Sequence, residues 1–396
     1  MTIDKQAVTS DLLSADGIIH LDNAGAALMP SCVLETQIEH LRLEAAVGGY
    51  EAARQKDSEI EAVYASVARL INCRADEVAI VENATVGWTM AFYAIQFERG
   101  DRILTAEAEY ASNYLAYLQM ARDKGVVVET IPSTVDGELC VESLKSMIDD
   151  RVKLISVTHI PTNGGLVNPV EEIGAVAQAN DILYLVDACQ SAGQIPLDVE
   201  KIRCDLLSAT GRKFLRGPRG VGFLYVRKHI LNDLHPPMID LFSATWLDAE
   251  HYELRQDARR FENWENNYAA RLGLGRAIDY ALDIGVENIE AEVTRLAEKL
   301  RSMLAEIAGV TVHDIGKRKC GIVTFSVAGV EATEVETRLR RAGVHVSMSS
   351  PSSTLIDATR RHLPNLVRSS VHYYNQDSQL ERFADLVKTI STQVSY

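Results

Sequence analysis

Short apolar runs alternate with stretches of helical periodicity from about residue 15 to residue 230. The apolar, β-rich runs predict strands at residues 77–81, 102–105, 126–131, 154–159, 182–187, 205–208 and 222–226. Helical periodicity fills gaps at residues 58–71, 86–97, 113–124, 141–148 and 170–180. This alternation predicts an α/β domain with a mostly parallel sheet between helices. Ligands of such sheets bind at the carboxyl ends of the strands.

The second half of the chain has a different pattern. A long helical stretch at about 267–307 is broken near 284–286. The pattern then predicts strands at 310–313, 322–327, 344–347 and 367–373, with helices at 332–342 and 379–393. We therefore expect a large domain at residues 15–265 and a smaller α+β domain that consists of residues 266–396 together with residues 1–14. We expect the charged run 248–265 to be a solvated connection.

Composition narrows the class of protein. The 396 residues are 47% hydrophobic and 24% charged, as in ordinary soluble globular proteins. A net charge of -15 argues against a nucleic-acid binder, which needs a basic face. No uncharged apolar run reaches membrane length, and the N-terminus has no signal-peptide pattern. The six cysteines are scattered without metal-ligand spacing, so we expect a cytoplasmic enzyme with no metal site.

The strongest chemical signal is an aspartate followed by a lysine on the next predicted loop. Asp187 ends an apolar strand, and Lys213 precedes the glycine-rich segment 217–222. A lysine amine can form an imine with a carbonyl cofactor, and a carboxylate can keep a pyridine nitrogen protonated. The pair is what a pyridoxal phosphate site needs. Taken alone, Asp187 is better explained as the cap of a strand or turn.

Other candidates flank the same predicted strand ends. Ala84 and Thr85 begin a helix, where N–H groups can bind phosphate, although simple N-capping by Thr85 explains them too. Thr210 and Arg212 could bind phosphate oxygens. Gln190 could donate to a phenolate oxygen of the cofactor.

Three further residues have an ordinary structural explanation beside the functional one. Tyr110 could stack on a flat ring, or be a partly buried tyrosine. Asn163 could reach a cofactor or substrate oxygen, or simply form the turn of its Asn-Gly-Gly sequence. Arg368 could clamp a substrate carboxylate, or lie on the surface at a strand end.

Together these segments resemble the class V aminotransferase family, the cysteine-desulfurase-like branch of the fold type I pyridoxal phosphate enzymes. The segments 185–193, 211–220 and 368–375 carry the resemblance, which extends from about His20 to the C-terminal helix. It implies a seven-stranded, mostly parallel sheet in a large domain, and a smaller C-terminal domain. The 211–220 segment looks closest to the cysteine C–S lyases and the isopenicillin N epimerase-like members.

The resemblance also implies roles for the candidates. Lys213 matches the imine lysine that moves protons, and Asp187 matches the partner of the pyridine nitrogen. Tyr110 matches the ring-stacking position, where desulfurases usually have histidine. The remaining matches are to groups around the cofactor and substrate: Gln190 to the phenolate partner, Ala84, Thr85, Thr210 and Arg212 to the phosphate site, Asn163 to the asparagine near the cofactor hydroxyl, and Arg368 to the carboxylate clamp.

Family members form homodimers in which the neighbouring subunit donates a phosphate contact. The matching segment here is 261–267, where the family's threonine is replaced near Glu265. A carboxylate would repel phosphate, so Asn263 or Asn267 could serve instead. Candidates near the mouth of the site are Tyr50, Arg216, Arg219, Trp246 and His345.

A desulfurase carries a persulfide-forming cysteine on a mobile loop, and the matching segment 344–353 has none. Serine cannot replace a thiolate in that step. We therefore expect a β-eliminating C–S lyase that acts on a cysteine-derived amino acid and releases a 2-oxo acid, ammonia and a sulfur species. An aminotransferase is the first alternative. An epimerase or racemase, with Tyr110 or His345 as a second base, is another. A scaffold that kept only the fold would not need Arg368.

Overall fold

Seven strands form the larger sheet of the computed structural model, which describes residues 3–13 and 17–393. The strands are β2 (Val78–Val81), β3 (Arg102–Ala106), β4 (Val127–Ile131), β5 (Val152–Thr158), β6 (Leu183–Asp187), β7 (Leu206–Thr210) and β8 (Gly222–Val226). Their order is β2-β8-β7-β6-β5-β3-β4. Only β8 runs antiparallel to its two neighbours. All seven strands predicted for this sheet are confirmed.

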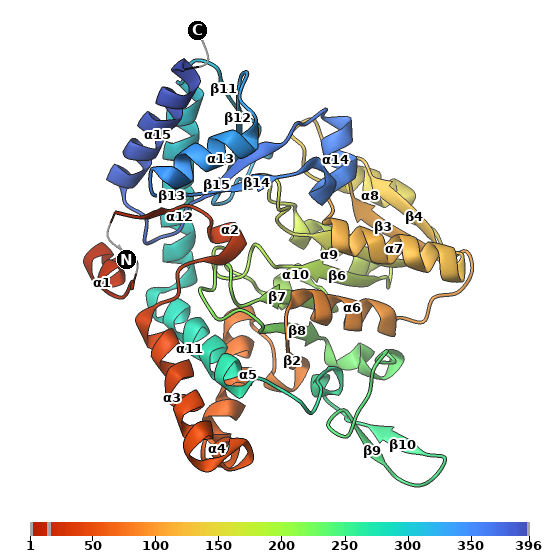
Figure 1. The fold of residues 1–396 in the computed structure, drawn as a ribbon. Coiled ribbons are helices and arrows are strands. Elements are labelled where there is room, and N and C mark those ends of the chain that lie inside the picture. Colours follow the sequence, from red (N-terminus) through yellow and green to blue (C-terminus); the bar gives the residue numbers. More distant parts are fainter. Residues whose placement is uncertain (1–2, 14–16, 394–396) are drawn as a thin grey trace.

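Helices cover both faces of this sheet (Figure 1). One face packs against α5 (Asp57–Ile71), α8 (Val141–Met147), α9 (Val170–Ala179), α10 (Val199–Ile202) and α11 (Tyr268–Ile284). The other face packs against α6 (Ala84–Ala94) and α7 (Ala111–Lys124). Strand residues alternate between the two layers: Ile80 and Val186 contact the first, and Ala79 and Leu185 the second. The predicted α/β architecture is confirmed.

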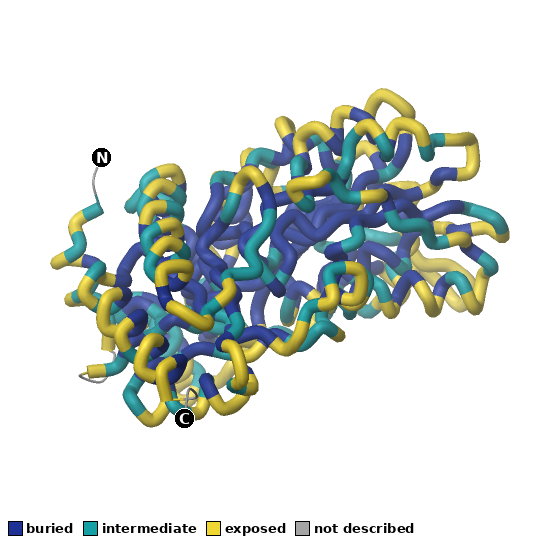
Figure 2. Tube along the Cα trace, turned by 90° about the horizontal axis from the view of Figure 1, so that it is seen from above, coloured by how far each residue is buried: buried dark blue, intermediate teal, exposed yellow. Residues whose placement is uncertain are grey.

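A second, antiparallel sheet lies in the C-terminal part of the chain. Its order is β11 (Val310–Val312), β12 (Ile322–Val327), β15 (Leu366–Ser370) and β14 (Ser347–Ser349). The helices α12 (Val286–Ala305), α13 (Ala332–Arg341) and α15 (Asp377–Thr392) pack on it. Figure 2 shows buried chain running through the interior of both parts, with exposed turns at the rim.

The N-terminal segment belongs with this second sheet. The two-residue strand β1 (Ile19–His20) pairs in parallel with β13 (Val344–His345), and Val8 of α1 (Lys5–Ser10) joins the same apolar cluster. The predicted domain boundary at residues 14 and 15 lies outside the described residues. The boundary at 266 stays a prediction, since it precedes α11, which packs against the larger sheet.

The remaining elements are short, apart from α3. The helices are α2 (Asn23–Ala26), α3 (Ser31–Val47), α4 (Gly49–Gln55) and α14 (Leu355–Arg360), and the short 3-10 turns are η1 (Ala75–Glu77), η2 (Lys228–Asp233), η3 (Ala258–Phe261) and η4 (Pro351–Thr354). The strands β9 (Ala244–Trp246) and β10 (Tyr252–Leu254) form a hairpin that projects from the body (Figure 1). None of the described helices is long and apolar enough to cross a membrane.

The charged run 248–265 is not wholly a solvated connection. Glu262 is only 2% exposed. Its carboxylate accepts hydrogen bonds from the Tyr64 hydroxyl at 2.8 Å and the Ile80 N–H at 2.9 Å, and it pairs with Arg271 at 2.6 Å. The expectation was wrong here because a charge run does not reveal which of its members has buried partners.

Candidate active site

A cavity of about 290 Å³ opens at the carboxyl ends of β5, β6 and β7, beside the first turn of α6. This size is at the lower end of small-molecule pockets, roughly 300–1,000 Å³. The cavity is lined by predicted site residues from widely separated segments: Ala84, Thr85, Tyr110, Asp187, Gln190, Thr210, Arg212 and Lys213. The structure thus brings together most of the residues that the sequence pattern singled out.

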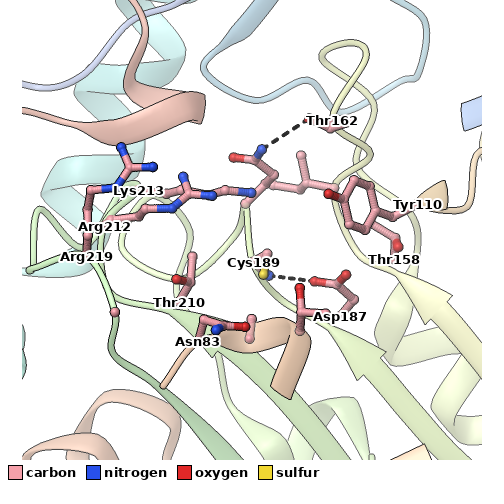
Figure 3. Close-up of a pocket in the computed structure, with 15 residues that line it drawn as sticks. Asn83, Tyr110, Thr158, Thr162, Asp187, Cys189, Thr210, Arg212, Lys213 and Arg219 are labelled. Atoms are coloured by element: carbon pink, nitrogen blue, oxygen red, sulfur yellow. Dashed lines mark hydrogen bonds between the residues drawn. The ribbon is translucent and has the colours of Figure 1, made fainter. Parts of the chain in front are cut away.

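Asp187 lies at the end of β6 and is 6% exposed. Its carboxylate accepts hydrogen bonds from the Cys189 N–H at 2.9 Å and from the Asn113 side-chain amide at 3.0 Å. Because both partners are N–H donors, the buried carboxylate stays in one position and can accept a further hydrogen bond from a cationic ring nitrogen. Tyr110 and Asp187 lie on the opposite side of the cavity from Arg212 and Arg219 in Figure 3.

Lys213 follows β7 in a tight turn. The Gly217 N–H donates to the Gly211 carbonyl at 2.8 Å, and the Arg216 N–H donates to the Lys213 carbonyl at 2.9 Å. Burial lowers the pKa of the Lys213 amine, and the nearby Arg212 and Arg368 charges lower it further. A lysine with a lowered pKa is more readily the neutral nucleophile that imine chemistry requires.

The first turn of α6 faces the cavity. Asn83 caps this helix by accepting a hydrogen bond from the Val86 N–H at 3.0 Å. The capping role considered for Thr85 therefore falls to Asn83. Gly222 lets β8 lie close to this turn and to β7, since a Cβ there would lie 2.4 Å from the Ala209 carbonyl oxygen and 3.2 Å from the Ala84 nitrogen. N–H groups of a first helical turn lack intrahelical partners and suit an anion.

Arg212 and Arg219 supply positive charge to the cavity. One Arg212 guanidinium nitrogen donates to the Gly25 carbonyl, and burial lowers the pKa of this guanidinium. Of the mouth candidates, Arg219 lines the cavity. Arg216 does not, since its buried guanidinium donates to the Leu28 carbonyl at 2.7 Å and to the Tyr373 hydroxyl at 2.7 Å.

The placement of Asn163 differs from the expectation. Its amide donates to the Ser350 carbonyl at 2.9 Å and to the Thr354 hydroxyl at 3.0 Å, so it ties the larger part of the chain to the 350–354 segment. Its neighbour Thr162 lines the cavity instead. The Thr162 hydroxyl accepts a hydrogen bond from Gln190 at 3.4 Å (Figure 3). Thr162, one position before Asn163 in the turn, was not predicted from the sequence.

Arg368 of β15 lies behind Thr162 rather than in the cavity wall. Its guanidinium donates to the Thr162 hydroxyl at 2.7 Å, to the Ser347 hydroxyl at 3.1 Å and, more weakly, to the Asp22 carboxylate at 3.4 Å. Its side chain is 12% exposed, and burial lowers its pKa. A cation fixed by three partners can still present its remaining N–H groups to a substrate carboxylate.

Asp22 is a second residue that sequence analysis missed. Its carboxylate accepts a hydrogen bond from the Ser347 hydroxyl at 2.9 Å. The same carboxylate lies so close to Gly25 that a Cβ at position 25 would be only 2.6 Å from one of its oxygens. A side chain at position 25 would push the Asp22 carboxylate out of its present position. The signal in the sequence was the Asp-Asn-Ala-Gly segment at the start of α2, which alone does not reveal the contact with Arg368.

Comparisons with known proteins agree with this geometry. The sequence profile of the family Aminotransferase class-V matches residues 19–383. A probable cysteine desulfurase of Synechocystis sp. is 30% identical over 383 residues, which cover 92% of this chain and 89% of that protein. The chain therefore belongs to the class V aminotransferase family, whose cofactor is pyridoxal 5′-phosphate.

Solved structures of similar proteins share the fold. The apo cysteine desulfurase of Thermococcus onnurineus superposes with a TM-score of 0.91 at 26% identity and covers 99% of both chains. The cystine C–S lyase C-DES, solved with its reaction product cysteine persulfide, gives a TM-score of 0.85 at 20% identity, covering 94% of this chain and 98% of that one. At this lower identity the likeness concerns the fold alone.

The residues present fit pyridoxal phosphate. The Gln190 side chain lines the cavity, and its buried side-chain oxygen has no hydrogen-bond partner within the described parts of the chain. The Gln190 amide nitrogen, which donates to the Thr162 hydroxyl at a long 3.4 Å, is the atom that could donate to a phenolate oxygen of the cofactor. Lys213 could form the imine with the cofactor's carbonyl carbon, and Asp187 could pair with its ring nitrogen. The first turn of α6, together with Thr210, could hold the phosphate.

Proposed function

We propose that the protein is a pyridoxal phosphate-dependent C–S lyase that acts on cystine or another cysteine-derived amino acid. The observation that carries this proposal is a cavity with a lysine, a carboxylate and a nearby arginine clamp, next to a 344–353 segment without cysteine. The similar proteins named cysteine desulfurase support a sulfur-containing amino acid as substrate. Its products would be a 2-oxo acid, ammonia and a sulfur species.

Binding and orientation fall to residues of both sheets. Arg368 holds the substrate carboxylate, and Thr162 and Ser347 keep the guanidinium in position. When bound, the cofactor delocalises the electron pair left on the substrate Cα, and Asp187 keeps its ring nitrogen protonated. Tyr110 lines the cavity wall, where it would cover a face of the cofactor ring.

Lys213 moves the proton. Its amine takes the proton from the substrate Cα, which requires the neutral form that burial favours. The Cβ–S bond then breaks with its electron pair going to sulfur, and a double bond forms between Cα and Cβ. Hydrolysis of the released enamine gives the 2-oxo acid and ammonia. Cystine would yield pyruvate, ammonia and cysteine persulfide.

The thiol in the cavity is a poor candidate for a sulfur relay. Cys189 lines the cavity, but burial and the Asp187 charge raise the pKa of its thiol. A thiol that stays protonated is a weak nucleophile. This supports direct release of sulfur on a small molecule over storage of sulfur on the protein.

The proposal is tested by incubating the holoenzyme with cystine in the absence of any amino acceptor. We expect 2-oxo acid to accumulate over many turnovers, and we expect Lys213→Ala to produce none while folding normally. Product that forms only after a 2-oxo acid acceptor is added would establish the aminotransferase instead. Loss of optical activity without 2-oxo acid would establish a racemase.

The protein is also proposed to be a homodimer. Large apolar side chains are exposed around the β9–β10 hairpin and α4: Tyr50, Leu241, Trp246, Leu247 and Trp264. A partner surface would cover such a patch. Of the proposed phosphate contacts from a second subunit, Asn267 already caps α11, whereas Asn263 contacts Glu82 at 3.3 Å. Light scattering should give twice the chain mass of 43.7 kDa; a monomer would contradict the proposal.

We also place the enzyme in the cytoplasm, because all six cysteines are free, as expected in a reducing compartment.

A further inference from the structure

A second buried carboxylate lies behind Asp187. Glu109 follows β3, is 3% exposed and does not line the cavity. Its oxygens accept hydrogen bonds from the Thr105 hydroxyl at 2.9 Å, the Tyr110 N–H at 2.9 Å and the Thr158 N–H at 3.0 Å. The Thr158 hydroxyl contacts it as well. The donors come from β3, β5 and the start of α7, so one side chain joins three elements at the edge of the site.

Asn113 connects this carboxylate to the site. Its side-chain nitrogen lies 2.8 Å from Glu109 and 3.0 Å from Asp187. An amide nitrogen carries two hydrogens and accepts nothing, so it donates one hydrogen bond to each carboxylate. Asn113 is itself 4% exposed, and its amide therefore has one orientation that satisfies both partners. The position of the Asp187 carboxylate is thereby tied to that of Glu109.

The charge on Glu109 is unusual for a purely structural link. The described structure gives it no salt bridge to a lysine, arginine or histidine. Burial and the neighbouring Asp187 charge raise its pKa. A protonated carboxyl group must donate a hydrogen bond, but three of the Glu109 partners are N–H groups, which cannot accept one. These partners therefore favour the ionised carboxylate. Two acidic side chains joined by one amide thus concentrate negative charge on the side of Asp187 away from the cavity.

We propose that Glu109 is a positioning residue for the reaction. Through Asn113 it fixes the Asp187 carboxylate and adds a second negative charge behind it, so that the pyridine nitrogen of the bound cofactor stays protonated. The same carboxylate holds the Tyr110 N–H and Thr158, and both of these residues line the cavity. This inference rests on the proposed role of Asp187.

The test measures the protonation of the ring nitrogen directly. Holoenzyme is reconstituted with pyridoxal phosphate labelled with 15N in the ring, and the 15N chemical shift is recorded for wild type, Glu109→Gln, Asn113→Ser and Asp187→Asn. We expect the wild-type shift to be that of a pyridinium. Both Glu109→Gln and Asn113→Ser should move it toward the unprotonated value and lower kcat by about 10–100-fold, with KM changed by less than about threefold.

Glu107→Gln is the matched control. Glu107 lies two residues earlier in the same segment, where its carboxylate contacts Ser133 at 3.1 Å and Arg360 rather than Asn113. It should leave the 15N shift and kcat as in wild type. Asn113→Ser is included because the amide introduced by Glu109→Gln would face existing donors and could prevent folding.

The outcomes separate the two claims. A folded Asn113→Ser enzyme with the wild-type 15N shift and kcat would overturn the role of Glu109, provided that Asp187→Asn moves the shift. If Asp187→Asn itself leaves the shift unchanged, the role of Asp187 fails, and the inference about Glu109 fails with it. A loss of thermal stability without a change in shift would show that Glu109 only supports the fold.

Discussion

At the scale of single residues, Asp22 contacts Arg368, the residue that we propose holds the substrate carboxylate. The Asp22 carboxylate lies next to Gly25 and 3.4 Å from the Arg368 guanidinium. The Ser347 hydroxyl forms hydrogen bonds with the side chains of both Asp22 and Arg368. A substrate carboxylate on Arg368 would therefore bind close to a second negative charge. Like charges a few ångströms apart repel, although partial exposure of Asp22 weakens the effect.

Replacing Asp22 by asparagine should tighten substrate binding. The change removes the negative charge and keeps the shape and the acceptor for Ser347. We expect KM for cystine to fall by about threefold to tenfold, since about 1.4 kcal/mol corresponds to tenfold. Steady-state kinetics measure this, and Arg368→Ala is the opposite control, in which KM should rise by about tenfold or more. A higher KM in Asp22→Asn would mean that Asp22 orients Arg368 more than it competes with substrate.

Single site residues could be predicted where a motif fixes the backbone around them. Asp187 ends a strand and Lys213 follows the next one, so parallel pairing brings them to the same edge. Asn163 could not be placed, because successive side chains in its turn point to different surroundings: Thr162 into the cavity and Asn163 toward Ser350. Nor could Asp22, whose contact with Arg368 joins residues at opposite ends of the chain.

At the scale of elements, Glu262 connects the segment after η3 to β2, α5 and α11. Its buried carboxylate bonds to Ile80, Tyr64 and Arg271, one from each of these elements. Burying an ion pair costs solvation energy, but removing one partner leaves the other charge buried and unpaired. The sequence showed only a charged run, in which Glu262 looks like its exposed neighbours.

Replacing Glu262 by alanine should therefore destabilise the fold by about 3–5 kcal/mol, because Arg271 would lose its buried counter-ion. Urea unfolding followed by circular dichroism measures the change. Glu39→Ala, at an exposed position of α3, is the matched control and should change stability by less than about 0.5 kcal/mol. Equal midpoints for Glu262→Ala and wild type would contradict the role given to this contact.

Strands and helices themselves were largely predictable, because apolar runs and helical periodicity report burial on a sheet or a helix face. The break between α11 and α12 coincides with Gly285, whose φ of 87° suits glycine. The pairing of β1 with β13 was not predicted. Two residues carry too little pattern, and the parallel partner lies over 300 positions away.

At the scale of the whole molecule, the site is assembled where the two sheets meet. The larger sheet supplies Asp187 and Lys213 at its strand ends, and the smaller sheet supplies Arg368 and Ser347. Asn163 fastens the 350–354 segment to the larger part. In this arrangement the segment 344–353 contributes the Ser347 hydroxyl that contacts Arg368, and it contains no cysteine.

The fate of sulfur tests this account most directly. Purified holoenzyme is turned over with cystine, the carbon product is identified, and persulfide is quantified separately on small molecules and, by intact mass, on the protein. We predict pyruvate, with one small-molecule persulfide formed for each pyruvate and no sulfur added to the protein. Alanine formed from cysteine in a parallel incubation, with one sulfur atom added to the protein as a persulfide, would contradict the central claim that this site is a lyase without a thiol relay.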